Sequence, residues 1–223
     1  TLFNALTKAG IAASNYPFCT IEPNIGVVPV PDPRLEKIAA IAKSEKIIPA
    51  TTQFVDIAGL VAGASKGEGL GNQFLANIRN TQAIAHVVRC FENDDVTHVA
   101  GKVDPVADIE VIHTELALAD LESVEKALVK INKEARAGSK EVLKKQATLE
   151  KVRAHLDAGQ AVRTLALEKE QQEFLTTYQL LTEKPTLYVA NVDEEGFEGI
   201  FAGSEIASAT NPLKAGESGI SEF

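Results

Sequence analysis

Residues 54–71 are FVDIAGLVAGASKGEGLG, a short apolar run that ends at Asp56 and passes into a glycine-rich segment. Phe54 and Val55 are typical of a buried strand, and five of the thirteen positions from 59 to 71 are glycine. Glycine costs backbone entropy on folding, so this density is unusual for a purely structural connection. It favours a loop that changes shape beside the acidic residue. The simpler alternative is that Asp56 is a helix N-cap or turn residue beside an ordinary surface loop.

The composition is that of a soluble globular protein. The chain has 223 residues, of which 45% are hydrophobic. No apolar run reaches the length of a membrane span, and no secretory signal opens the sequence. Cys19 and Cys90 belong to no CxxC pair, and the four histidines show no zinc-ligand spacing. We therefore expect a reducing, cytoplasmic setting and no membrane partner.

Charge is distributed unevenly along the chain. The net charge of −9 argues against nucleic-acid binding over the whole surface, and no DNA partner is expected. Residues 126–153, however, contain nine Lys or Arg and three Glu. This basic segment on an acidic body is either a solvated helical surface or a local contact for RNA.

The first 104 residues mix strand-type runs with loops and one helical run. GVVPVP (26–31) and TQFVD (52–56) are typical of strands, and AIAHVVRCF (83–91) is typical of a buried strand. Between the last two, Leu70, Phe74, Leu75 and Ile78 follow helical spacing. This alternation predicts an α/β fold with a parallel sheet.

Residues 105–182 change character and predict an inserted helical module. Apolar residues recur every three or four positions up to Ala135, and the pattern resumes from Val142 to Leu156. The interruption at 136–140 predicts an antiparallel helical hairpin with its turn at Gly138. A further helix is expected over 167–181, before the chain returns to a strand in PTLYVANVDEEG (185–196).

Polar residues follow three of the predicted strands: Asp56, the run Glu92–Asp95, and Asn191. In open α/β sheets, ligands bind at the carboxyl ends of the strands. The pattern Asp-x-x-Gly at 56–59 has a specific use in phosphate-binding switch proteins. There the carboxylate holds Mg²⁺ through a water, and the glycine N–H reaches the γ-phosphate. The sequence therefore favours a site for Mg²⁺ and a nucleotide phosphate at this edge.

Three stretches closely resemble the Obg-like ATPase family, in its YchF branch of translation-factor-class P-loop NTPases. They are NYPFCTIEPNIGVVPVPDPRL (15–35), FVDIAGLVAGASKGEGLGNQFLANIR (54–79) and NVDE (191–194). The resemblance runs from Thr1 to about Gly199. It implies a Ras-like nucleotide-binding domain, an inserted helical domain and a C-terminal TGS domain. The expected organisation is a nucleotide-binding part at 1–104, the helical domain at 105–182, a base-recognition strand and loop at 183–199, and an unassigned tail at 200–223.

Two departures from the family pattern concern the ends of the sequence. The family's P-loop, Gly-x-x-x-x-Gly-Lys-Ser, should end immediately before Thr1 and is absent, as is the strand before it. No TGS domain follows residue 199. We therefore expect a fragment that binds ATP weakly, with an exposed gap between neighbouring strands of its sheet.

The resemblance assigns phosphate and metal roles by position. Thr1 matches the residue after the P-loop serine, whose backbone N–H would meet the α-phosphate. Thr20 matches the switch threonine that ligates Mg²⁺, although a hydroxyl there could also simply cap a turn. Asp56 and Gly59 take the metal and γ-phosphate roles described above.

Leu60 stands where many Ras-like GTPases have a water-orienting glutamine, and a leucine cannot hydrogen-bond water. We expect His98 to orient the attacking water, since it lies in a loop just beyond a buried strand and the family has a mobile histidine loop there. The alternative is a solvated histidine without a catalytic role.

The run from Asn191 to Glu194 bears on the base. Guanine-specific relatives use Asn-Lys-x-Asp, but here Val192 removes the lysine and Glu194 is longer than Asp by one methylene. Asn191 can still bond a purine, and the Val192 backbone could meet the adenine amine. ATP is therefore favoured over GTP.

Three functions remain in competition. The first is a monomeric, Mg²⁺-dependent switch that hydrolyses ATP slowly and acts on the ribosome. The second is the same switch with GTP as its nucleotide. The third is a non-enzymatic interaction protein that uses its helical hairpin.

Overall fold

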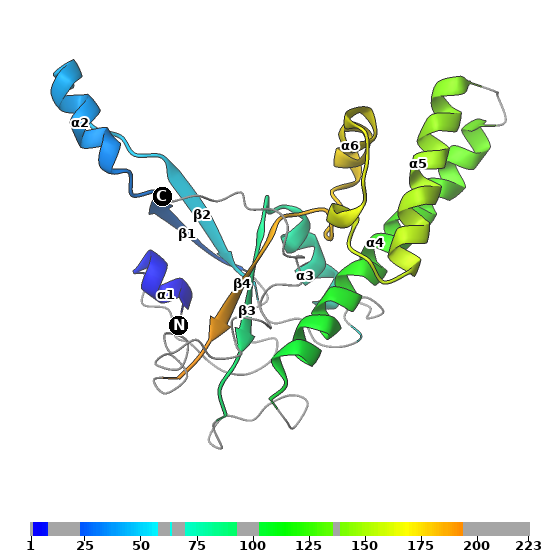
Figure 1. Cartoon of the computed structure of the whole chain (residues 1–223), viewed down its shortest axis with the longest axis horizontal. Coiled ribbons are helices and arrows are strands. Elements are labelled where there is room, and N and C mark those ends of the chain that lie inside the picture. Colours follow the sequence, from blue (N-terminus) through cyan, green and yellow to red (C-terminus); the bar gives the residue numbers. More distant parts are fainter. Residues whose placement is uncertain are drawn as a thin grey trace.

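The structure is a computed structural model of the whole chain, and it describes residues 2–8, 23–57, 63, 70–92, 103–135 and 139–193. Its elements follow in chain order: α1 (Leu2–Thr7), β1 (Asn24–Pro29), α2 (Pro33–Ala42), β2 (Thr51–Asp56), α3 (Leu70–Arg79), β3 (Ile84–Arg89), α4 (Pro105–Ala135), α5 (Lys140–Asp157), α6 (Lys169–Leu175) and β4 (Thr186–Asn191), with 3₁₀ turns at Val162–Thr164 and Thr176–Tyr178. Figure 1 shows β3 and β4 at the centre, with β1, β2 and α2 extending to one side and α4, α5 and α6 to the other.

Strands β1 and β2 pair in antiparallel register, so the prediction of a wholly parallel sheet is wrong for this part of the chain. Asn24 lies opposite Asp56, and Pro29 lies opposite Thr51. A parallel pair needs a crossover that packs over the sheet. Helix α2 instead continues outward beyond the ends of the two strands (Figure 1), and its Ile41 is 84% exposed. The connection is therefore the loop of a long hairpin.

Helix α1 packs against β1 at a glycine. A Cβ added at Gly26 would lie 2.2 Å from Cγ2 of Thr7, so no larger residue fits without displacing the helix. The Thr7 hydroxyl donates a 2.8 Å hydrogen bond to the Phe3 carbonyl oxygen within the same helix. The absence of a side chain at Gly26 thus allows the close approach of α1.

Strands β3 and β4 pair in parallel, as predicted for the buried strands. Ile84 lies opposite Thr186, and Arg89 lies opposite Asn191. The strands are far apart in sequence and are separated by the whole helical region. Between them, the rings of His86 and Tyr188 lie with their centroids 5.7 Å apart. Burial lowers the pKa of His86, which lies inside the strand.

The described strands form two separate two-stranded sheets, β1–β2 and β3–β4, with no ladder between β2 and β3. Apolar side chains on these strands face solvent: Val27 is 62% exposed, Val87 46% and Leu187 66%. Each pair of strands thus carries apolar side chains that are exposed.

Helices α4 and α5, called here the helical pair, lie side by side and share one apolar core with the segment that follows them (Figure 1). Val124, Leu149, Val152 and Leu175 are almost fully buried in it. The two helices cover the two predicted helical runs, while the predicted turn at Gly138 lies outside the described residues. None of the described helices has the length and apolar character of a membrane span.

The helix expected over 167–181 is shorter than predicted. Helix α6 ends at Leu175, a 3₁₀ turn follows, and Gln179 adopts a left-handed φ of 50°. The next residues, Leu181 and Thr182, give their backbone N–H groups to Asp120 rather than to a helix. A tertiary contact therefore ends this helix early.

Candidate functional site

The predicted metal ligand Asp56 is the last residue of β2, and its side chain is exposed. The strand forms because Thr51–Asp56 pairs along its length with β1. Ile57, the next residue, turns into an apolar cluster with Leu75 and Leu116. Asp56 thus lies at a strand end beside a partly buried neighbour, with its side chain exposed.

The predicted base-recognition residues lie at the end of the other sheet. Asn191 is the last residue of β4 and has an exposed side chain, while Val192 is half-buried. The backbone oxygen of Asn191 accepts a 2.8 Å hydrogen bond from the N–H of Cys90, which follows β3. This hydrogen bond holds the main chain of Asn191 in place, while its exposed side-chain amide can meet a ligand.

Four of the predicted site residues lie outside the described residues: Thr1, Thr20, Gly59 and His98. The described residues contain no group of three or more His, Cys, Asp or Glu side chains that could hold a metal ion. Of the two predicted metal ligands, Asp56 is the one that the described residues include, and it carries a hard carboxylate oxygen of the type that Mg²⁺ takes in nucleotide sites. The described part of the chain thus fits one ligand of such an ion.

Sequence analysis missed a contact of the glycine-rich segment. The backbone N–H of Gly63 donates a 2.6 Å hydrogen bond to Oε1 of Glu115, on α4. Glu115 is only 6% exposed, although it is charged. Gly63 has a φ of +86°, a conformation that residues with a side chain rarely adopt. No sequence pattern indicates this pairing, because 52 positions separate the two residues.

A second contact joins α4 to the segment before β4. Asp120 is fully buried and accepts hydrogen bonds from the backbone N–H groups of Leu181 and Thr182, at 2.8 and 2.7 Å. It also accepts one from the Thr182 hydroxyl at 2.7 Å, and Arg79 lies 3.6 Å away. Burial raises the pKa of Asp120, and these donors together with the Arg79 charge oppose that rise.

Arg79, at the end of α3, completes this junction. Its guanidinium donates to the Ala119 carbonyl oxygen at 3.2 Å and to Oγ of Ser123 at 3.0 Å, both on α4. The ammonium of Lys184 in turn donates to the backbone oxygens of Arg79 and Thr81. Helices α3 and α4 and the start of β4 are therefore joined by charged side chains as well as by apolar packing.

The helical pair carries two described histidines, one on each helix. His113 is half-buried on α4, and burial lowers its pKa; its Nε2 has no hydrogen-bond partner among the described residues. His155 lies on α5, where Nε2 is 2.8 Å from the Thr164 hydroxyl.

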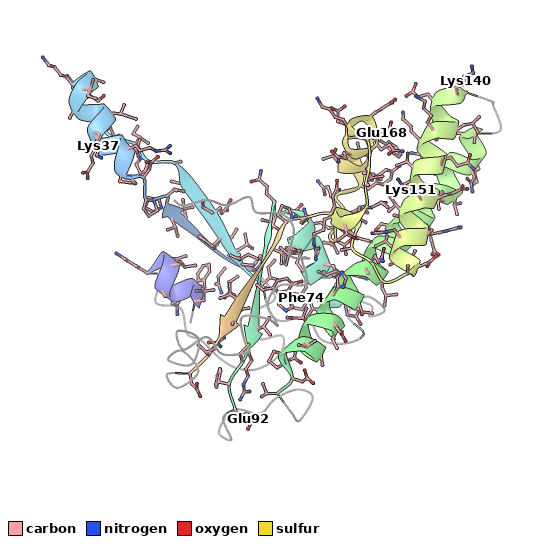
Figure 2. All side chains as sticks on the ribbon, viewed as in Figure 1. Lys37, Phe74, Glu92, Lys140, Lys151 and Glu168 are labelled. Carbon is pink, nitrogen blue, oxygen red and sulfur yellow. The ribbon has the colours of Figure 1, made fainter. Side chains whose placement is uncertain are left out.

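Some of the basic side chains of 126–153 have acidic neighbours. Lys145 lies 2.6 Å from Glu141, and Lys144 lies 3.6 Å from Glu170, which α6 brings onto this surface. Lys140 stands at the end of α5 that is far from the sheets (Figure 2). Acidic side chains thus offset part of the positive charge of α5 where it lies beside α6.

The amino-acid sequence matches a family model described as 50S ribosome-binding GTPase over residues 1–143. It is similar to two proteins named ribosome-binding ATPase YchF. The one from Haemophilus influenzae is 62% identical over 198 residues, which are 89% of this chain and 54% of that protein. The one from Bacillus subtilis is 50% identical over 195 residues, 87% of this chain and 53% of that protein. The chain thus spans about half the length of the curated relatives it matches.

The fold is similar to that of a solved structure. The structure of the Schizosaccharomyces pombe YchF GTPase superposes with a TM-score of 0.71 and 36% sequence identity. The superposition covers 93% of this chain and 57% of that protein. The described strands and helices therefore belong to a P-loop GTPase-like α/β fold.

Proposed function

Since this chain belongs to the 50S ribosome-binding GTPase family, in its YchF branch, we propose that it is the nucleotide-binding part of a ribosome-associated switch that binds and slowly hydrolyses ATP with Mg²⁺. The observation that carries the proposal is the placement of Asp56. It ends a strand just before the glycine-rich segment in the sequence, with an exposed carboxylate and a partly buried neighbour in Ile57. Ligands of α/β folds bind at such strand ends.

Each proposed role matches a residue type to its chemistry. Asp56 and Thr20 supply the hard oxygens that hold Mg²⁺, which neutralises charge on the phosphates when bound. The backbone N–H groups of Thr1 and Gly59 bind phosphate oxygens. Together these groups stabilise the negative charge that spreads over the transferred phosphoryl group in the transition state.

The base is proposed to be adenine. Asn191 presents its amide at the end of β4, and Val192 follows in place of the lysine found in guanine-specific sites. GTP is the second candidate nucleotide, because the family model and the fission yeast structure both carry the name GTPase.

Competition between nucleotides tests this proposal in an extended chain, in which residues preceding the matched segment of the Haemophilus influenzae relative are joined before Thr1. We expect unlabelled ATP to displace a fluorescent ATP analogue at a concentration at least about tenfold below that of GTP, since a site built for one donor pattern rejects the other. A preference for GTP would replace ATP as the proposed nucleotide. If neither ATP nor GTP binds and is hydrolysed, the proposed switch function is contradicted.

His98 is proposed to orient the attacking water. In the extended chain, His98→Ala is expected to lower kcat about 100-fold and to leave nucleotide affinity nearly unchanged, because a water-orienting group acts mainly in the transition state. Single-turnover hydrolysis and fluorescence titration measure the two quantities. The matched control is His155→Ala, on the far side of the helical pair, for which we expect wild-type turnover. Equal turnover of both variants would show that His98 has no catalytic part.

The helical pair is proposed to be a domain inserted into the nucleotide-binding fold, as a coiled-coil hairpin. Residues 105–182 carry their own apolar core, and the strands β3 and β4 before and after them pair directly. We further propose that the protein acts as a monomer in the cytoplasm, where ribosomes are found.

The far end of this pair is proposed to contact ribosomal RNA. Lys130, Lys133 and Lys140 are exposed and form no ion pair with another described residue. Lys144 and Lys145 have the acidic neighbours Glu170 and Glu141. The first three lysines can therefore meet phosphates without first breaking an ion pair.

Replacing Lys130, Lys133 and Lys140 by Glu is expected to weaken ribosome co-sedimentation about tenfold or more, because three phosphate contacts are lost and counterions are no longer released. Wild-type binding should fall steeply with added salt for the same reason. The matched control, Lys144→Glu with Lys145→Glu, should have a smaller effect. Salt-insensitive binding, or unchanged sedimentation of the triple variant, would leave the basic surface as ordinary solvated helix.

A further inference from the structure

We propose that Glu115 is a positioning residue for nucleotide hydrolysis, which acts by holding the glycine-rich segment after Asp56 at the backbone of Gly63. The inference rests on the proposed function, because it assigns Glu115 a part in the same reaction. Glu115 does not touch the nucleotide in this proposal. It acts through the loop that carries the phosphate-binding glycine.

The contact has the properties of a specific anchor. The hydrogen bond from the Gly63 N–H to the Glu115 carboxylate is 2.6 Å long, and the carboxylate belongs to a side chain that is only 6% exposed. Hydrogen bonds to ionised acceptors are roughly twice as strong as those between neutral groups. Burial of a carboxylate is costly unless donors satisfy it, so a charged residue here needs such a partner. Leucine or alanine would serve simple packing better.

The backbone of Gly63 has a conformation that few other residues could adopt. Its φ of +86° is open to glycine but strained for other residues. Among the described residues, no atom would lie within 4 Å of a Cβ added at Gly63, so packing by these residues does not hold Gly63 in place. A hydrogen bond to a fixed acceptor can do so. Gly63 lies four positions after Gly59 in the sequence, so we expect an anchor at Gly63 to limit where the proposed γ-phosphate ligand can lie.

Helix α4 is a rigid support for this anchor. Glu115, Ala119, Asp120 and Ser123 are spaced so that they fall on one side of the helix. Glu115 holds the glycine-rich segment before α3, and the other three residues meet Arg79 at the end of α3. The loop and the helix that follows it are thus attached to the same helix face at two points. An acceptor on such a support can place a backbone N–H reproducibly.

The first arm of the test measures the contact in the chain itself. We expect Glu115→Ala to increase the hydrogen-exchange rate of the Gly63 amide about tenfold or more, because its acceptor is removed. Glu115→Gln keeps an acceptor oxygen of the same shape and should preserve most of the protection. Glu125→Ala, an exposed glutamate on the same helix, is the matched control. Equal exchange rates of the Gly63 amide in the unsubstituted chain and the three variants would show that Glu115 does not hold Gly63.

The second arm measures hydrolysis in the extended chain. We expect Glu115→Ala to lower kcat about tenfold with KM changed less than about twofold, and Glu115→Gln to retain at least about half of kcat. If Glu115 had only a structural role, both variants would have a lower melting temperature. Both kcat and KM would then change, and Glu115→Gln would not restore them. Wild-type kcat in Glu115→Ala, or equal loss in both Glu115 variants, would overturn the positioning role. If the unsubstituted extended chain does not hydrolyse ATP, the proposed function fails, whereas the exchange arm still decides whether the anchor exists.

Discussion

Replacing Asp120 by alanine is expected to lower the free energy of unfolding by about 3–5 kcal/mol, the range found when one partner of a buried charged network is removed. Asp120 is fully buried and accepts three hydrogen bonds, from the backbone N–H groups of Leu181 and Thr182 and from the Thr182 hydroxyl. Alanine leaves these donors without an acceptor and Arg79 without its counter-charge. Denaturant unfolding followed by circular dichroism measures the loss.

Two further variants separate the buried network from simple charge removal. Asp120→Asn keeps the shape and one acceptor oxygen, so we expect an intermediate loss of about 1–3 kcal/mol. Glu122→Ala removes an exposed carboxylate whose partner is Lys126, one turn along the same helix. Its loss should stay below about 0.5 kcal/mol, as for other exposed ion pairs. A similar small loss for Asp120→Ala would show that the junction contributes little to stability.

Extending the chain before Thr1, as described above, is expected to tighten ATP binding about 100-fold or more, which corresponds to about 2.8 kcal/mol. The added P-loop supplies backbone N–H groups and a lysine for the phosphates. The added strand also has a place in the structure, since β2 and β3 lie in separate sheets and Val87 and Leu187 expose apolar surface. Calorimetric titration with ATP and Mg²⁺ compares the two chains.

A lysine-to-alanine change within the added Gly-Lys-Ser distinguishes phosphate binding from improved folding. This variant restores the strand but not the phosphate contact, so we expect most of the gain in affinity to disappear while the gain in thermal stability remains. Micromolar ATP affinity in the unextended chain would contradict the prediction. It would mean that Asp56, Asn191 and their neighbours bind the nucleotide without a P-loop.

Local sequence patterns predicted the elements that depend on periodic burial. The apolar spacing between 105 and 135 predicted α4, because a long helix buries one side of itself wherever its partner lies. The continuous apolar run at 83–91 predicted β3, because such runs are typical of strands in parallel sheets. Asp56 and Asn191 were also placed correctly at strand ends, because polar residues there interrupt an apolar run. Helix α2 was not predicted, although Leu35, Ile38 and Ile41 recur at helical spacing and Asp32 caps its first turn.

Local patterns in the sequence thus indicated the family, most of the helices and strands, and which residue types stand at the strand ends. Three features could be seen only in the folded protein. They are the antiparallel pairing of β1 with β2, the early end of α6, and the contacts of Glu115 and Asp120. The physical reason is distance along the chain. A hydrogen bond such as that between Gly63 and Glu115 joins residues 52 positions apart, and Asp120 meets Thr182 across 62. Neither pairing leaves a periodic trace in the sequence. Each exists because the packing of α3 against α4 brings a buried carboxylate to backbone N–H groups that need an acceptor.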